Sequence, residues 1–224
     1  MNETGGMEAR MSTAAKADVG WCYGNGWRQM KSHFLELLLI TLLVFAISVP
    51  FALASEYSET DGVWSPLMGM FAFFYGILIL GPVVIGALYA ALKAARGEKL
   101  EVTDMFIFQK NYLNIVLGKL LLGAIVAIGL VFLIIPGIFF LCKLAFVPFL
   151  LTDRKMEAVE AVKESWRMTK GHAFMIFLIF LIAVPVTIAG ILCLGVGVIV
   201  SMMWIDCTIA SMYYAVAGAE GEQL

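Results

Sequence analysis

Long apolar stretches follow one another through most of this chain, at a length that suits membrane crossing. A spanning helix needs about 20 predominantly apolar residues. Such stretches lie at 34–54, 64–95, 113–135, 137–151, 173–194 and 198–217. The composition agrees, since 62% of the residues are hydrophobic and only 14% are charged, whereas soluble domains carry about 25% charged residues. We predict an all-α membrane protein with six transmembrane helices.

Two of these stretches depart from the usual length. Stretch 64–95 is overlong, so we expect it to bend near Gly76, Gly81 and Pro82 or to continue into the cytoplasm. Stretch 137–151 is short, about 22 Å as a helix. We expect the chain to turn at Pro136-Gly137 just before it, and a re-entrant hairpin at this turn is an alternative to a full span.

The basic residues indicate the orientation in the membrane. Thirteen of the fifteen lie before the first stretch, between the second and third, or between the fourth and fifth. The connections at 55–63, 136–137 and 195–197 carry none. The positive-inside rule makes the basic side cytoplasmic, so both termini are expected inside. No cleavable signal peptide is recognised, and we interpret residues 1–15 as a disordered leader before one membrane domain at 16–224.

A short pattern recurs in the predicted cytoplasmic segments. "WRQMKSH" (27–33) and "WRMTKGH" (166–172) share Trp, Arg, Lys and His at identical spacing, and "FIFQKNY" (106–112) is a weaker copy. Each copy leads into an odd-numbered span. We therefore predict three tandem units, at 20–98, 99–152 and 153–222, each an interfacial segment followed by a helical hairpin. Repeats that share one topology imply a pseudo-threefold axis along the membrane normal.

The repeated positions suit the headgroup layer, where aromatic rings lie at the interface and Lys or Arg meets lipid phosphates. We interpret them as interfacial contacts to lipid or to a partner. They are Trp27, Arg28, Lys31, His33, Lys110, Tyr112, Trp166, Arg167, Lys170 and His172. In an alternative interpretation, His33 and His172 face each other and bind an anionic headgroup or a metal.

Segment 153–170 is predicted to be an amphipathic helix on the inner leaflet. Asp153 is a suitable cap for its first turn. Met156, Val159, Val162 and Trp166 form one apolar stripe at helical spacing. A docking face for a cytoplasmic partner is the alternative role for this helix.

Several segments together resemble a known family. They are "GPVVIGALYAALKAARGE", "IIPGIFF", "FVPFLLTDRKMEAVEAVKESWRMTKGH" and the tyrosine pair near the end of the last span. These resemble a large, uncharacterised bacterial family of six-helix integral membrane proteins, and are similar to the membrane domain of some glycerophosphodiester phosphodiesterases. The resemblance covers about residues 20–220. It implies a bacterial inner-membrane location and a six-helix fold, but no activity. In that family a proline usually stands near the position of "WIDC", where this chain has an aspartate, Asp206.

Two charges lie deep within the predicted spans, Lys143 and Asp206, whereas Glu36 and Lys119 lie near the inner ends of their spans and are interpreted as interfacial. Helical rise places them about 9 Å and about 13–14 Å from the outer surface. The long stem of Lys143 allows its ammonium group to snorkel outward. Asp206 is too short to do so, and alone and ionised at this depth it would cost roughly 2.5–3.5 kcal/mol.

Asp206 is therefore expected to be paired, protonated or beside water. Lys143 is the natural partner, and a Lys143–Asp206 pair would be either a structural link or part of a water-lined path. The third possibility is a protonated Asp206 bonded to a backbone carbonyl, Thr208 or Ser211. We treat Asp206 and Lys143 as the candidate intramembrane polar pair.

Other residues favour packing over chemistry. Small residues form stripes in the second and sixth stretches and predict close helix contacts: Gly86, Ala90 and Ala94, and Cys207, Ser211 and Ala215. The sequence has no Walker loop, HExxH, GxSxG or dinucleotide motif, no CxxC, and only two histidines. We expect no catalytic residue, metal or cofactor, and the charge balance of 15 basic to 17 acidic residues gives no sign of a nucleic-acid partner.

The sequence thus favours a non-catalytic inner-membrane protein that binds a membrane partner or lipid, in an accessory or organising role, alone or as a homo-oligomer. The alternative is a small-solute or proton transporter or channel with an Asp206–Lys143 polar path. An intramembrane enzyme would need a cluster of polar residues that we could not assemble.

Overall fold

The computed structural model describes residues 18–59, 62–132, 134–192 and 196–221 of the chain. Within these ranges, six helical stretches are long and apolar enough to cross a membrane. They are Phe34–Ser58, Ser65–Ala95, Tyr112–Val131, Pro136–Asp153, Ala173–Leu192 and Gly197–Gly218. The predicted all-α membrane architecture is confirmed. The predicted leader at 1–15 lies outside the described residues.

The elements follow one another along the chain as twelve helical segments within the described residues. The first six are α2 (Val19–Ser32), α3 (Phe34–Ser58), α4 (Ser65–Tyr75), the π-helix η1 (Gly76–Leu80), α5 (Gly81–Ala95) and the 3-10 helix η2 (Val102–Asn111). The others are α6 (Tyr112–Phe132), α7 (Ile134–Lys143), α8 (Val147–Asp153), α9 (Ala158–Met168), α10 (Ala173–Leu192) and α11 (Val196–Gly221).

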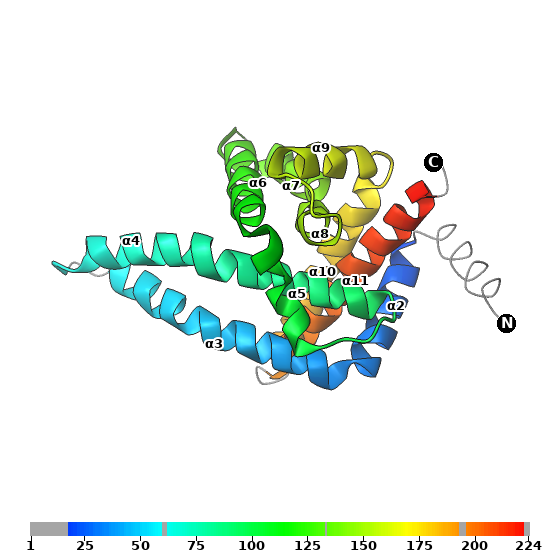
Figure 1. Cartoon of the computed structure of the whole chain (residues 1–224), viewed down its shortest axis with the longest axis horizontal. Coiled ribbons are helices and arrows are strands. Elements are labelled where there is room, and N and C mark those ends of the chain that lie inside the picture. Colours follow the sequence, from blue (N-terminus) through cyan, green and yellow to red (C-terminus); the bar gives the residue numbers. More distant parts are fainter. Residues whose placement is uncertain (1–17, 60–61, 133, 193–195, 222–224) are drawn as a thin grey trace.

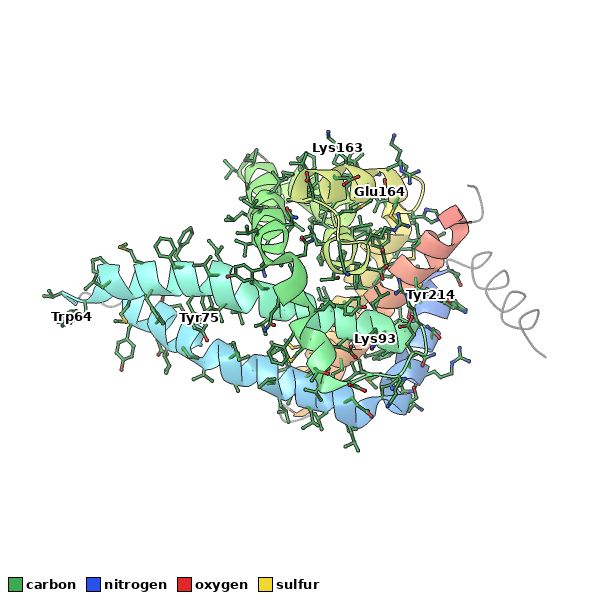
Figure 2. The ribbon with its side chains drawn as sticks, viewed as in Figure 1. Trp64, Tyr75, Lys93, Lys163, Glu164 and Tyr214 are labelled. Carbon is green, nitrogen blue, oxygen red and sulfur yellow. The ribbon has the colours of Figure 1, made fainter. Side chains whose placement is uncertain are left out.

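Consecutive long helices pack in pairs, α3 with α4, α6 with α7, and α10 with α11. Figure 1 shows that the pairs diverge, since α3 and α4 extend to the left while α6 rises steeply away from them. The diverging arms expose large apolar side chains, such as Trp64, Val131 and Leu192. This exposure suits helices that face lipid, because apolar side chains are stable in contact with hydrocarbon. Figure 2 shows Trp64 at the tip of the α3–α4 arm and Lys93 and Lys163 at the other end of the molecule.

The arms meet at a core built from α5, α8 and α11. Helix α5 packs against both α8 and α11. Both predicted small-residue stripes are buried in this core, where they let helix backbones come close. Large side chains from α8 and α11 complete it, and the Phe149 ring stacks on the Tyr213 ring with centroids 5.1 Å apart. The core is therefore formed by the C-terminal part of the second helix of each hairpin, namely α5, α8 and α11.

The three predicted interfacial segments fold as short helices, α2, η2 and α9. Helix η2 packs on α5, α9 packs on α8 and α6, and α2 packs on α11, so the N-terminal segment joins the C-terminal helix. Gly26 makes the last contact possible, because a Cβ there would lie 2.7 Å from Thr208 Oγ1 and 2.9 Å from the Thr208 backbone nitrogen. Each short helix thus packs on a helix that belongs to one of the three hairpins. This arrangement suits a threefold repeat, and the pseudo-threefold axis stays a prediction.

The second stretch changes its helix type where a bend was predicted, and the bend itself stays a prediction. The π-helix η1 begins at Gly76 and separates α4 from α5, which begins at Gly81. A π-helix leaves backbone groups poorly paired and often marks a special site. Here the Tyr112 hydroxyl donates to the carbonyl of Leu78 at 2.6 Å, so a side chain from α6 satisfies a π-helix acceptor.

The fourth stretch differs from its prediction in two ways. Helix α7 already begins at Ile134, so Pro136 and Gly137 lie in its first turn and do not form the connection. Proline is tolerated there because the first N–H groups of a helix have no intrahelical acceptor. The stretch is also not one helix over 137–151, since residues 144–146 form a turn between α7 and α8. Pro148 then stands in the first turn of α8.

The amphipathic segment after α8 also differs from its prediction. Asp153 ends α8 and caps nothing, while Glu157 is the N-cap residue of α9. The buried face of α9 consists of Ala158, Ala161, Ser165 and Met168. Val159, from the predicted apolar stripe, is 56% exposed. The predicted stripe is therefore confirmed only in part: Met156 and Val162 are partly buried against the core and Trp166 packs on Phe139 and Phe140, while the most buried positions of α9 are mostly small residues.

Candidate functional site

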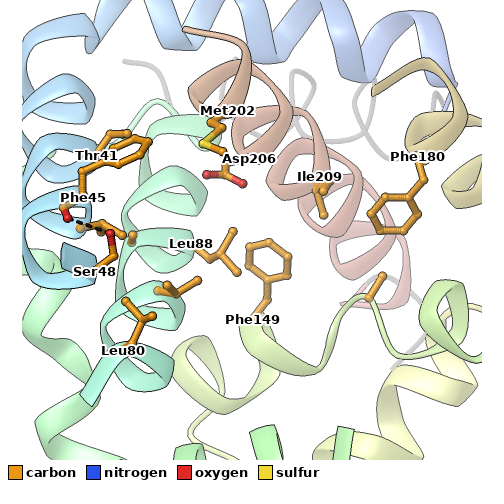
Figure 3. A pocket seen from close by; sticks show the side chains of 14 residues that line it. Thr41, Phe45, Ser48, Leu80, Leu88, Phe149, Phe180, Met202, Asp206 and Ile209 are labelled. Atoms are coloured by element: carbon orange, nitrogen blue, oxygen red, sulfur yellow. Dashed lines mark hydrogen bonds between the residues drawn. The ribbon is translucent and has the colours of Figure 1, made fainter. Parts of the chain in front are cut away.

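A cavity of about 560 Å³ lies between α3, α5 and α11, with α8 and α10 at its margin. Figure 3 shows Asp206 of α11 projecting into it, with Thr41, Phe45 and Ser48 of α3 across from it. The remaining lining is apolar: Val44, Leu80, Val84, Ala87, Leu88, Ala145, Phe149, Phe180, Met202 and Ile209. Its size falls in the range of small-molecule sites, about 300–1,000 Å³.

The polar groups of this cavity are few. The Thr41 hydroxyl donates to the Leu37 carbonyl at 2.8 Å, and the Ser48 hydroxyl donates to the Phe45 carbonyl at 2.7 Å. Both hydroxyls thus donate their proton to a backbone carbonyl of α3. Across the described residues, the Asp206 carboxylate has no hydrogen-bond or ion-pair partner, and the lining contains no Lys or Arg. The cavity is an apolar space with one carboxylate that the protein leaves unpaired.

The rim of the cavity is formed by exposed apolar side chains. Phe45 of α3 is 41% exposed and Met202 of α11 is 43% exposed. Both belong to helices that are long and apolar enough to span a membrane.

Lys143 does not meet Asp206, and the predicted pair is not formed. Its side chain is 6% exposed, and Nζ donates to the Thr169 carbonyl at 3.3 Å. The rings of Phe139 and Trp166 lie 5.6 and 5.8 Å from Nζ, close enough for cation–π attraction. The outward snorkelling predicted for Lys143 is also wrong, since the ammonium group is buried against the α9–α10 connection.

The break in the fourth span explains this position of Lys143. The Val147 N–H bonds to the Leu144 carbonyl, which leaves the Lys143 carbonyl without its ordinary helical donor. The Ser165 hydroxyl donates to that carbonyl at 2.9 Å, and the Thr169 hydroxyl, which donates to the Ser165 carbonyl at 2.8 Å, lies 3.3 Å from it. Irregular backbone in a membrane protein is tolerated where other protein groups satisfy it. The break at residues 144–146 and the C-terminal end of α9 are therefore joined by hydrogen bonds from Ser165 to the Lys143 carbonyl and from the Lys143 side chain to the Thr169 carbonyl.

A second polar cluster, which the sequence interpretation missed, joins α5, α8 and α11. Arg96 donates two hydrogen bonds to Asp153, Nη1 to Oδ1 at 2.8 Å and Nη2 to Oδ2 at 2.6 Å. The Tyr213 hydroxyl donates to Asp153 Oδ2 at 3.0 Å. Burial lowers the pKa of Arg96, but the hydrogen bonds to Asp153 and the nearby negative charges of Asp153 and Glu98 together outweigh that effect and raise the pKa overall. A signal was present, since Arg96 and Asp153 end two spans on the same side of the membrane.

The local sequence places Arg96 for this contact. Helix α5 ends there because Gly97 adopts φ +71°, a left-handed conformation that glycine takes without strain. The Glu98 N–H bonds back to the Lys93 carbonyl, which completes a Schellman-type cap. The Arg96 side chain then leaves the last turn of α5 toward Asp153. This bidentate cluster links the core helices and leaves no open coordination site, so we regard it as structural.

The aromatic residues of the repeated heptapeptide pack mainly on protein. Trp27 lies on Trp204 with ring centroids 4.9 Å apart, and Trp166 lies on Phe139 and Phe140 at 6.0 and 5.9 Å. As described above, Tyr112 bonds the π-helix. Trp27 also remains 39% exposed to the surroundings of the protein. The interfacial role predicted for these rings is therefore combined with helix packing.

The basic members of the repeat lie mostly on the surface. Arg28, Lys31, Arg167 and Lys170 are exposed, and Lys31 Nζ lies 5.0 Å from the Trp27 ring centroid. The side chain of Lys110 lies outside what the structure describes. His33 and His172 are half-buried, and Nδ1 of His172 is buried without a hydrogen-bond partner. Among the described residues, no group of three His, Cys, Asp or Glu side chains is arranged to hold a metal.

No family model matches the chain, and no curated protein or solved structure matches it. The resemblance to the bacterial six-helix family therefore stays a prediction that rests on the quoted segments. The chemistry of the site has to be argued from its own residues. Its most distinctive feature is Asp206, which has no partner within the described residues, in a mostly apolar cavity.

Proposed function

We propose that this protein is a non-catalytic membrane protein that takes a ligand from the bilayer into the cavity between α3, α5 and α11. The ligand is a lipid or a lipid-like molecule with an apolar body. The observation that carries the proposal is the cavity itself, about 560 Å³ of mostly apolar space within a membrane-spanning region.

The shape of the fold supports a lipid-like ligand. The hairpins diverge from the core (Figure 1), and the cavity is lined mainly by residues of α3, α5 and α11. Phe45 and Met202 at the rim are exposed, which gives a lateral route that an acyl chain can follow without crossing a polar surface. Binding sites are usually largely pre-formed and apolar with few polar groups, and this cavity has that composition.

The location proposed for this function is the bacterial inner membrane, with both termini in the cytoplasm. The basic residues around α2, η2 and α9 support it through the positive-inside rule. In that orientation the short helices lie at the cytoplasmic face, where the exposed Arg28, Lys31 and Lys170 would meet anionic headgroups.

The transport alternative required Asp206 and Lys143 on one polar path. Lys143 is engaged with Thr169 and shielded by Phe139 and Trp166. A path that uses both charges would need that contact to open first. Binding requires no such rearrangement, so it is the function that the geometry supports best.

The proposal is tested by filling the cavity. Ala87 of α5 lines it, and Ala87→Phe should occupy the space that a ligand would use. Native mass spectrometry of gently extracted protein should show a bound lipid-like mass on the natural protein that the variant lacks. Ala127→Phe, on the exposed face of α6, makes the same change outside the cavity and should keep the bound mass. Equal binding by all three proteins would overturn the proposal.

A further inference from the structure

The lone carboxylate of the cavity calls for a positively charged partner. Ionised carboxylates in apolar surroundings are unfavourable unless they are paired. Asp206 faces the cavity, and within the described chain nothing bonds to it. The Thr41 and Ser48 hydroxyls, the other polar groups of the lining, donate their protons to Leu37 and Phe45 carbonyls.

Neither nearby intramembrane lysine supplies that partner. Lys143 donates to Thr169 and contacts two aromatic rings. Lys119 packs its stem beside Gly81, where its Cδ would lie 3.0 Å from an added Cβ, and it is not among the residues that line the cavity. No described side chain of the protein supplies the complementary charge, so Asp206 is either protonated in the empty cavity or paired with a cation that a ligand brings.

The rest of the lining also suits a cation. Phe45, Phe149 and Phe180 present aromatic rings to the cavity (Figure 3), and ring faces attract ammonium groups. The same lining offers no Lys or Arg within its described residues, so a phosphate or carboxylate headgroup would be buried unpaired beside a like charge. Most phospholipid headgroups are excluded on this ground.

We infer that the cavity binds amphiphilic amines, molecules with one protonated amine on an apolar body, with the amine held by the Asp206 carboxylate. This inference rests on the proposed function and narrows its ligand class. The hydrocarbon part occupies the space among Leu80, Leu88 and Ile209, and the ammonium group donates to the Asp206 oxygens. The rings of Phe45 and Phe149 flank the apolar part and shield the ion pair from lipid.

The test compares dodecylamine, which is protonated at pH 7, with dodecan-1-ol, which has the same chain and no charge. Both are titrated onto the whole protein in a non-ionic detergent, and bound probe is counted by native mass spectrometry. The natural protein should bind the amine at least tenfold more tightly than the alcohol. Asp206→Asn should abolish this preference by weakening amine binding at least tenfold, while alcohol binding stays unchanged.

Two further variants keep the result interpretable. Asp206→Glu restores the carboxylate and should restore the preference for the amine. Glu36→Gln removes a carboxylate from α3 outside the cavity and should bind both probes like the natural protein. If the natural protein shows no preference, or if Asp206→Asn keeps it, the inference is overturned.

The cavity-filling variant separates the two proposals. If Ala87→Phe removes binding of both probes while Asp206→Asn changes neither, the cavity binds ligands but the charge inference is wrong. If Ala87→Phe leaves the binding of both probes intact, the cavity is not the binding site, and the proposed function fails with the inference that rests on it.

Discussion

Lys143 lies against Thr169 across 26 residues of chain. The Lys143 ammonium group donates to the Thr169 carbonyl at 3.3 Å, and the Thr169 hydroxyl, which donates to the Ser165 carbonyl at 2.8 Å, lies 3.3 Å from the Lys143 carbonyl. The contact lies where the fourth span is broken, so the lysine belongs to the structure of the break. Of the predicted Lys143–Asp206 pair, only Asp206 is therefore open to a ligand.

This separation gives a first prediction. Lys143→Met and Asp206→Asn should have additive effects on the free energy of unfolding, with a coupling below about 0.5 kcal/mol, because residues without a shared contact behave independently. The measurement is a double-mutant cycle by reversible unfolding in mixed micelles. A coupling well above 1 kcal/mol would show that the two charges do meet.

The Arg96–Asp153 contact should behave in the opposite way. Two short charge-assisted hydrogen bonds in a partly buried setting should give a coupling of about 1–3 kcal/mol in the cycle of Arg96→Met and Asp153→Asn. The matched control is Lys99 with Glu101, which are 3.7 Å apart and largely exposed. That surface pair should show no measurable coupling.

The α2–α11 contact predicts a difference between two glycines of one helix. Gly26→Ala places a methyl group against the backbone of Thr208, so we expect a loss of about 1–3 kcal/mol from overpacking. Gly24→Ala meets nothing within 4 Å and should be neutral or stabilising by up to about 1 kcal/mol, since alanine favours helix. Thermal unfolding of both variants in detergent checks the prediction. Equal stability of the two would mean that α2 does not pack on α11.

Acidification should weaken the two ion pairs of Glu164, one within α9 to Arg167 and one to Arg154 after α8. Hydrogen bonds from Arg167, together with its charge and that of Arg154, lower the pKa of Glu164 below its ordinary value of 4.5. A lowered pKa in the folded state means that the stabilisation is complete above pH 4.5 and is lost as the pH falls through the lower value. The gap in Tm between the natural protein and Glu164→Gln should therefore close in that acidic range.

A matched carboxylate serves as control for this pH effect. Glu160 is exposed on the same helix, and no ion pair to it is found among the described residues. Glu160→Gln should leave Tm nearly unchanged at every pH. If Glu164→Gln behaves like Glu160→Gln at pH 7, the contact between α9 and the Arg154 loop is not stabilising.

Much of the fold follows from short-range features of the sequence. Runs of apolar residues locate the spans because a membrane helix needs about 20 of them, and Gly76 with Gly81 and Pro82 locate the π-helix. The stripes that contain Ala90 and Ser211 predict close packing in the core, since small residues let helices approach.

The candidate site could be predicted only in part. Asp206 stands out because a charge in an apolar run is costly. Its partner could not be deduced from depth alone, since depth along a helix says nothing of the direction in which a side chain points. Lys143 turns toward Thr169 because of a break at residues 144–146, and that break depends on contacts with α9, which follows later in the chain. The Arg96–Asp153–Tyr213 cluster likewise brings together residues from three separate spans.

The most direct test of the central claim is photo-crosslinking from the cavity in native membranes. A benzophenone amino acid replaces Phe45 at the cavity rim or, as control, Phe73, which is exposed on α4 outside the cavity. The attached molecules are identified by mass spectrometry. The account predicts one enriched, amine-bearing species at position 45 and the ordinary mixture of membrane lipids at position 73. The same lipid mixture at both positions would contradict a specific site at Asp206.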